Sequence, residues 1–196
     1  MAPSKKILFN NIFKNLNISS NYQSPKNTST KNNTVTSLIN PYIIYTKTLL
    51  HILSENKKSK DYYKKIESNY DGHFTYKVKP PISLLDYLKR IIKYLKIEFT
   101  TLIISMIYID RICKERVFIN EYNIHRIMLI AIYIAYTFNE DCIQDNNYLA
   151  LVSGISKKEM VLLENEFLEL IDFKLFVTDD TFEEYKKYFF RDFNNI

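Results

Sequence analysis

Residues 127–138 read Ile-Met-Leu-Ile-Ala-Ile-Tyr-Ile-Ala-Tyr-Thr-Phe, and this uncharged stretch decides the fold. A helix that is apolar on all sides has to be surrounded by other helices. Ala131 and Ala135 stand four residues apart within it, and small residues on one helical face let neighbouring helices cross closely. Because amphipathic segments lie on both sides, the stretch predicts the central helix of an all-α bundle.

The segments around this central stretch have the periodicity of helices, and no segment alternates well enough to be a strand. Helix-start signals fix several of the boundaries, including a capping box formed by Ser156 and Glu159. The predicted helices are 83–96, which begins at Ser83 and Asp86; 99–114; 121–138, capped by Asn120; 145–152, which ends before Gly154; 157–171; and a last helix that begins near Asp180.

The part of the chain before residue 82 differs in composition. Residues 1–36 are rich in Asn, Ser, Thr and Lys and contain no acid, which predicts a disordered basic arm. A helix is expected to start near Pro41 with Asn40 as its cap. Its docking face is expected to include Leu50, Leu53, and Tyr45 or Leu49. The predicted organisation is 1–36 basic arm, 37–81 helix plus Lys-rich linker, 82–178 helical box and 179–196 C-terminal helix, and the linker is expected to be residues 55–81.

Charge is unevenly distributed along the chain. Residues 1–80 carry 13 Lys against 4 acids, whereas residues 81–196 carry 14 basic and 18 acidic residues. The helical part is therefore mildly acidic, and no specific nucleic-acid binding is expected of it. The longest apolar run, about 12 residues, is shorter than the ~20 that span a bilayer. The sequence predicts an intracellular protein without a membrane span, in the nucleus and/or cytoplasm.

Catalytic and metal-binding patterns are missing from the sequence. The two cysteines, Cys113 and Cys142, form neither a CxxC pair nor a zinc-ligand set. None of the three histidines belongs to a recognised nucleophile motif, and two glycines are too few for a nucleotide-binding loop. We therefore expect no enzyme activity, no cofactor and no metal.

Seven short words of the sequence resemble the cyclin box, and specifically the phosphate-pathway cyclins of yeast and the plant P-type (U-type) cyclins. The resemblance covers about residues 82–186, and the second and fifth words are specific to this subgroup. In chain order the words are Tyr108-Ile-Asp-Arg111, Asn123-Ile-His-Arg126, Ala135-Tyr-Thr-Phe138, Asn146-Asn-Tyr148, Ser153-Gly-Ile-Ser156, Leu163-Glu-Asn-Glu-Phe-Leu168 and Phe173-Lys-Leu-Phe-Val-Thr178.

The resemblance implies a five-helix cyclin box that binds a cyclin-dependent protein kinase and holds its regulatory helix in the active position. It implies an internal ion pair between Arg90 and Asp110; the residues alone leave open whether Asp110 pairs with Arg90 or locally with Arg111 or Lys114. The kinase-facing positions that it implies are Thr137, Phe138, Glu140, Glu164, Leu168 and Phe173.

One position departs from the family pattern. Most cyclins have Lys where this chain has Thr137, and that Lys pairs with the residue corresponding to Glu164. Here a cation from elsewhere substitutes, or the partner kinase differs, or hydrogen bonds alone hold Glu164. This departure leaves open a cyclin-fold scaffold without kinase activation. A transcription-associated cyclin-like module is a second alternative, because general transcription factors also use cyclin-like boxes.

Overall fold

The computed structural model describes residues 41–68, 72–115, 117–141 and 143–190. Within these ranges all regular elements are helices, which confirms the predicted all-α class. The predicted basic arm and the Asn40 cap lie outside the described residues. The helices are α2 (Pro41–Lys57), α3 (Tyr62–Ser68), α4 (Leu84–Leu95), α5 (Phe99–Glu115), α6 (Ile124–Asn139), α7 (Asn146–Ser153), α8 (Lys157–Leu170) and α9 (Asp179–Phe190).

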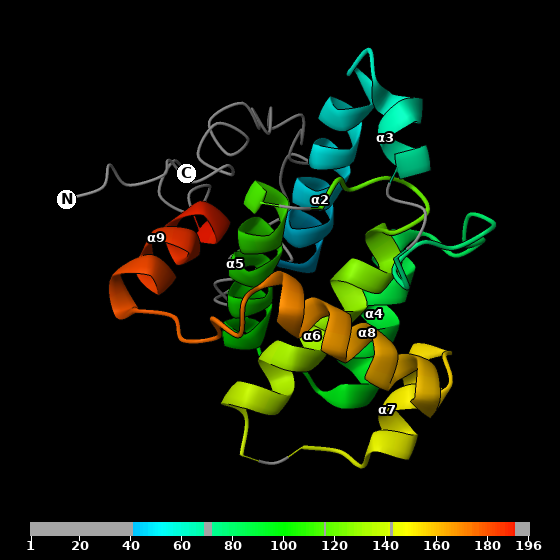
Figure 1. Cartoon of the computed structure of the whole chain (residues 1–196). Coiled ribbons are helices and arrows are strands. Elements are labelled where there is room, and N and C mark those ends of the chain that lie inside the picture. Colours follow the sequence, from blue (N-terminus) through cyan, green and yellow to red (C-terminus); the bar gives the residue numbers. More distant parts are fainter. Residues whose placement is uncertain (1–40, 69–71, 116, 142, 191–196) are drawn as a thin grey trace, which may run out of the picture.

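Helix α6 is the centre of the bundle. Every residue from Ile127 to Tyr136 is buried, and Ala131 and Ala135 are fully so. Helix α6 packs along α5, while α4 and α8 contact its other sides. Figure 1 shows α8 crossing α6 and α7 below them. The uncharged stretch is therefore enclosed by helices, as its composition predicts. None of the described helices has the length and apolarity that crossing a membrane requires.

Helix α6 starts three residues later than the sequence predicts. Asn120, the predicted cap, belongs to a turn in which its Oδ1 accepts the Tyr122 N–H at 2.8 Å. Its own N–H donates to Oδ1 of Asn123 at 2.8 Å. The helix then begins at Ile124. Asparagine side chains bond readily to nearby backbone, and here these bonds build a turn instead of extending the helix.

The other predicted boundaries of the box hold within one residue. The Ser83 and Ser156 hydroxyls each accept the N–H three residues on, at 3.1 Å, at the starts of α4 and α8. Helix α7 ends at Ser153, and the Gly154 that caps it has a φ of 73°, in the left-handed region that a glycine adopts without strain. Local capping chemistry is enough to set these ends.

Helix α2 belongs to the core of the bundle. Tyr45 and Leu49 are buried, whereas Leu50 is exposed. The Tyr45 hydroxyl lies 2.9 Å from Oγ of Ser105 on α5. The linker prediction for 55–81 is partly wrong, because α2 continues to Lys57 and α3 follows. Tertiary contacts stabilise these Lys-rich turns: the Asn56 side chain, for example, donates to the Ile119 carbonyl at 2.8 Å.

Helix α9 packs against α5 and α2. Its Tyr185 hydroxyl donates to Oδ2 of Asp110 at 2.6 Å. Its Phe189 ring lies 5.6 Å from Phe99 and 6.4 Å from Tyr45, centroid to centroid. The predicted C-terminal helix is thus part of the same core, and α2 and α9, which lie on either side of the five-helix box in the sequence, meet over α5.

Candidate functional site

The six predicted interface residues lie on the end of α6, on α8 and in the turn after α8, and we call this region the α6–α8 surface. Helices α6 and α8 are in contact, and Figure 1 shows α8 lying across α6. Large apolar side chains are exposed here: Phe138 is 56% exposed, Phe173 68% and Phe176 76%. Several large apolar side chains exposed in one region are typical of a surface that binds another protein.

Glu164 is a half-buried carboxylate on α8 that faces α6. It lies near Tyr133, and burial raises the pKa of both side chains. The Thr137 hydroxyl, one helical turn after Tyr133, donates back to the Tyr133 carbonyl at 3.0 Å and does not engage Glu164. Among the described residues, Glu164 has neither an ion pair nor a hydrogen bond. Burial therefore costs this charge free energy that nothing in the described chain offsets.

Glu140 already has partners within the domain. Its Oε1 accepts the Thr101 hydroxyl at 2.5 Å and lies 3.5 Å from the Glu98 N–H. Both groups belong to the start of α5, where a carboxylate is stabilised by the exposed N–H groups of the helix. Glu140 therefore ties the end of α6 to the start of α5.

The turn after α8 orients Phe173. Asp172 and Phe173 have φ of 57° and 54°, a left-handed pair without glycine, which costs backbone energy. The Phe173 N–H donates to the carbonyl of Leu168, a partly buried residue, at 2.9 Å. This strained turn leaves the Phe173 ring exposed, and its cost is tolerated because neighbouring contacts hold the segment.

Arg111, from the Tyr-Ile-Asp-Arg word, supplies one such contact. Its guanidinium donates to the carbonyls of Lys174 and Phe176, the latter at 3.0 Å. The Tyr108 hydroxyl donates to the Leu175 carbonyl at 2.8 Å. Tyr108 and Arg111, both from the Tyr-Ile-Asp-Arg word, thus hold residues 174–176 in place. This segment follows the exposed Phe173 ring and carries the exposed Phe176 ring. From the sequence, Arg111 was only one of the possible local partners of Asp110.

Arg90 and Asp110 have separate partners. Arg90 donates to the Leu151 carbonyl at 3.2 Å, and Asp110 accepts from Tyr185. The ion pairs of the described residues do not include one between the two side chains, and the pair that the resemblance implies stays a prediction.

An ion pair that the sequence did not reveal joins Arg126 to Glu159, between α6 and α8. Arg126 also donates to the His73 carbonyl at 2.7 Å and lies 3.7 Å from the centre of the Tyr76 ring. Glu159 was expected to return to the backbone of Ser156 as half of a capping box; it turns to Arg126 instead. We call these contacts the Arg126 clamp, because they hold the 73–76 segment on the bundle.

The buried His125, which precedes Arg126 in the sequence, should make the folded chain less stable in mild acid. Burial lowers its pKa below the usual 6.5, so the unfolded chain binds a proton at a pH where the folded chain does not. The free energy of unfolding should therefore fall as the pH drops below about 6.5. Urea titrations at pH 7 and pH 5 test this. From pH 7 to pH 5, the free energy of unfolding of a His125→Phe variant should fall less than that of the natural chain. An equal fall in both proteins would show that His125 is not the group responsible.

No group of His, Cys, Asp and Glu side chains with the arrangement of a metal site occurs in the described residues. Cys113 is a free thiol whose pKa is raised by burial, and Cys142 lies outside the described residues. The absence of a cofactor stays a prediction.

The family model and the similar proteins found by comparison all belong to one family. The family model described as Cyclin matches residues 14–175. Cyclin-U4-3 of Arabidopsis thaliana is 40% identical over 114 residues, which cover 57% of this chain and 52% of the relative. Cyclin-U4-1 of the same plant is 37% identical over 112 residues (56% and 55%), and Cyclin-P4-1 of Oryza sativa subsp. japonica 36% over 109 (55% and 51%). The chain spans about half the length of these relatives.

Proposed function

Because this chain belongs to the cyclin family, we propose that it is a non-catalytic regulatory subunit that binds a cyclin-dependent protein kinase and activates it. The family match carries the proposal, and the exposed rings and unpaired carboxylate of the α6–α8 surface support it. We propose that it acts inside the cell, in the nucleus and/or cytoplasm, where such a kinase works.

The physical basis is the stabilisation of one state of the kinase. A protein kinase needs its strand Lys paired with the Glu of its regulatory helix before ATP is oriented. A rigid surface that binds only the active position of that helix shifts the equilibrium toward it. The α6–α8 surface is rigid because α6 is enclosed and because Arg111 holds the segment after α8.

Glu164 indicates which chemical group the partner has to bring to the interface. Its carboxylate has no cation among the described residues, and Thr137 cannot provide one. A kinase that brings a basic side chain or N–H donors to this point gains a charge-assisted contact and removes the cost of the unpaired charge. Of the options that the sequence left open, we propose that the cation comes from the partner.

Charge reversal at Glu164 tests the proposal. The tagged full chain, Glu164→Lys and Glu169→Lys are used to recover partners from the cells in which the chain occurs. Glu169 is exposed on the same helix and is the matched control. The natural chain and Glu169→Lys should enrich a protein kinase, and Glu164→Lys should reduce its recovery about tenfold. Equal recovery by all three, or recovery of no kinase, would reject an interface at Glu164.

Activation is a separate readout of the same complexes. The recovered kinase is assayed on a generic protein substrate with and without added chain. A rise in rate supports an activator, whereas binding without any rise selects the scaffold. Deletion of residues 1–36 should leave kinase recovery unchanged; a chain that loses nucleic-acid affinity on this deletion and recovers no kinase would favour the transcription-associated module.

A further inference from the structure

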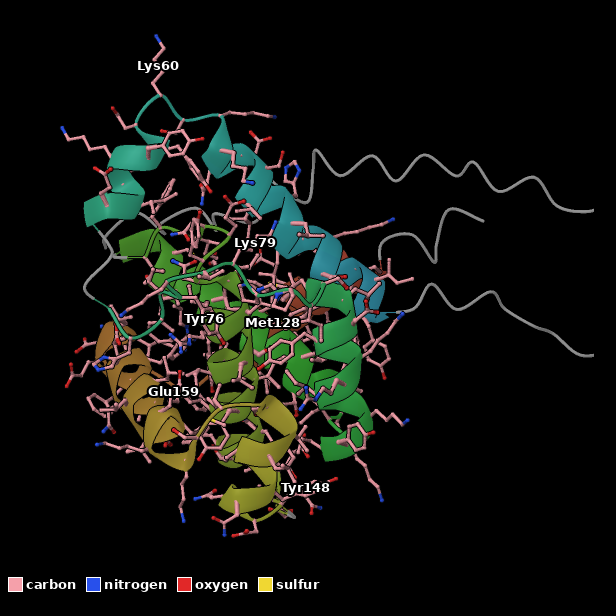
Figure 2. All side chains as sticks on the ribbon, turned by 90° about the vertical axis from the view of Figure 1, so that its right-hand side faces the viewer. Lys60, Tyr76, Lys79, Met128, Tyr148 and Glu159 are labelled. Carbon is pink, nitrogen blue, oxygen red and sulfur yellow. The ribbon has the colours of Figure 1, made fainter. Side chains whose placement is uncertain are left out.

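A cavity of about 540 Å³ lies beside α3, and we call it the α3 cavity. Its described walls come from α3, from residues 75–77 and from Tyr122 in the turn before α6. The volume is within the range of about 300–1,000 Å³ that is typical of ligand sites. Figure 2 labels Tyr76 of this wall and, above it, Lys60 at the tip of the turn between α2 and α3. The α3 cavity is not part of the α6–α8 surface.

Three tyrosines from separate parts of the chain line the α3 cavity: Tyr63, Tyr76 and Tyr122. Tyr63 is 79% exposed, and its ring meets that of the buried Tyr62 edge-on, with 5.4 Å between the centroids. The Tyr76 N–H donates to the Tyr122 carbonyl at 2.9 Å. The guanidinium of Arg126 lies 3.7 Å from the centre of the Tyr76 ring and holds it. Aromatic rings that are anchored and also reach solvent offer flat surfaces on which a planar ligand can stack.

The charged side chains around the α3 cavity are mostly positive. Lys77 lines it, and Lys60 and Lys64 are exposed on the adjoining turn and helix. Among the described residues, none of these three lysines takes part in an ion pair. Two carboxylates offset part of the charge: Asp61, next to Lys60, and Glu67, which lines the cavity and can accept a hydrogen bond from the amino group of a base. The remaining surplus of cations favours an anionic ligand.

A ligand that is both planar and anionic fits these two features together. Proteins bind single strands of nucleic acid by stacking bases on aromatic side chains and by pairing phosphates with cations. A methylated ammonium, which aromatic rings also attract, would be repelled here by Lys77 and Arg126. An inorganic anion would leave the rings uncovered, and the bases of a duplex are already stacked on one another.

We propose that the α3 cavity binds a single strand of nucleic acid with no fixed sequence. One base enters the cavity and stacks on the exposed ring of Tyr63. The phosphates on either side of this base pair with Lys77 and with the lysines of the α2–α3 turn and α3. The basic character of residues 1–80 thus continues into the part of the chain that the structure describes.

This proposal is independent of the kinase interface. Tyr122 lies just before the start of α6 and Phe138 near its end, and Ile124 and Phe138 stand fourteen positions apart, about 21 Å along the helix axis. The α3 cavity and the exposed Phe138 ring therefore lie toward opposite ends of α6. A chain that binds no nucleic acid leaves the kinase proposal standing.

Fluorescence anisotropy with a defined probe tests the site. The probe is a fluorescein-labelled oligodeoxycytidine of about 12 nucleotides, a length that single-strand sites cover. It is titrated with the full chain, with Tyr63→Ala and with Lys77→Glu. The matched controls are Tyr94→Ala and Lys187→Glu: Tyr94 is 48% exposed on α4, Lys187 is exposed on α9, and neither lines the cavity. The basic arm is the same in every protein, so its own attraction for the probe does not affect the comparison. Tyr63→Leu replaces Tyr63→Ala if circular dichroism shows that the latter is unfolded.

We expect saturable binding that Tyr63→Ala and Lys77→Glu each weaken by about tenfold, and an unchanged affinity for the two controls. Lys77→Glu should also make the affinity less dependent on salt, because fewer counterions are released. Equal affinities of Tyr63→Ala and Tyr94→Ala would show that no base stacks on Tyr63 and would overturn the proposal. Equal weakening by the two lysine reversals would show a diffuse electrostatic effect and would overturn it as well.

Competition experiments exclude other occupants of the α3 cavity. Unlabelled oligodeoxycytidine should displace the probe, whereas a DNA duplex of the same length, cytidine monophosphate and polyglutamate should displace it poorly. Displacement by any of these three as readily as by the unlabelled strand would overturn the proposal, and would indicate a duplex, a free nucleotide or an acidic protein segment as the ligand. An absence of probe binding to the full chain would also overturn it.

Discussion

Replacement of Ala131 by Phe is expected to leave no cooperatively folded protein. Ala131 is fully buried on α6, the helix that α4, α5 and α8 all contact. Overpacking by a few methylene groups already costs about 1–3 kcal/mol, and a phenyl ring needs far more space. The expected loss of more than about 4 kcal/mol is comparable to the whole stability of a domain, about 5–15 kcal/mol.

Thermal unfolding followed by circular dichroism measures this effect. Ala131→Phe should show helical signal without a sharp transition. Asn147→Phe adds the same ring at an exposed position of α7 and should change the free energy of unfolding by less than about 0.5 kcal/mol. A sharp transition of Ala131→Phe at the natural melting temperature would mean that α6 is not enclosed as described.

Replacement of Arg126 by Met should destabilise the chain by about 2–3 kcal/mol. The change keeps the apolar stem but removes the charge that Glu159 faces, the donor to the His73 carbonyl and the cation over the Tyr76 ring. It leaves a partly buried carboxylate and a backbone carbonyl without their partner. Because the clamp holds the 73–76 segment, amide hydrogen exchange there should rise more than in α5.

A double-mutant cycle separates the ion pair from the rest of the clamp. Glu159→Met alone should lower the free energy of unfolding less than Arg126→Met does, because it leaves the contacts of Arg126 with His73 and Tyr76 in place. The double variant should cost less than the sum of the two single changes, since it leaves no unpaired charge. Strict additivity of the two urea-unfolding free energies would show that the Arg126–Glu159 pair contributes nothing.

Local patterns in the sequence account for most of the fold. The absence of charge in 127–138 identified α6, and the start signals at Ser83 and Ser156 placed α4 and α8 within one residue. These features depend on side chains three or four positions apart, which a sequence displays directly. Where the local signal was ambiguous, as at Asn120, the boundary moved by three residues. In the Lys-rich segment after Ser54, helices appeared where polarity alone had indicated a linker.

The α6–α8 surface was only partly predictable. The family words placed Phe138 and Phe173 on an exposed surface, and the structure finds both rings exposed. That Glu140 is already bonded to Thr101, and that Arg111 holds the segment after α8, depends on contacts between residues about 40 to 65 positions apart. No spacing rule connects such residues before the helices are packed.

The sequence by itself determined the helical class, the central helix and the family. Only the tertiary structure decided which charges meet: Arg126 pairs with Glu159, Arg90 lies over Gly154, and Glu164 is half-buried without a partner in the described chain. The physical reason is that helix formation follows from short-range periodicity, whereas the partner of a charged side chain depends on its distance to every other charge and on its burial. Both quantities exist only once the bundle has formed.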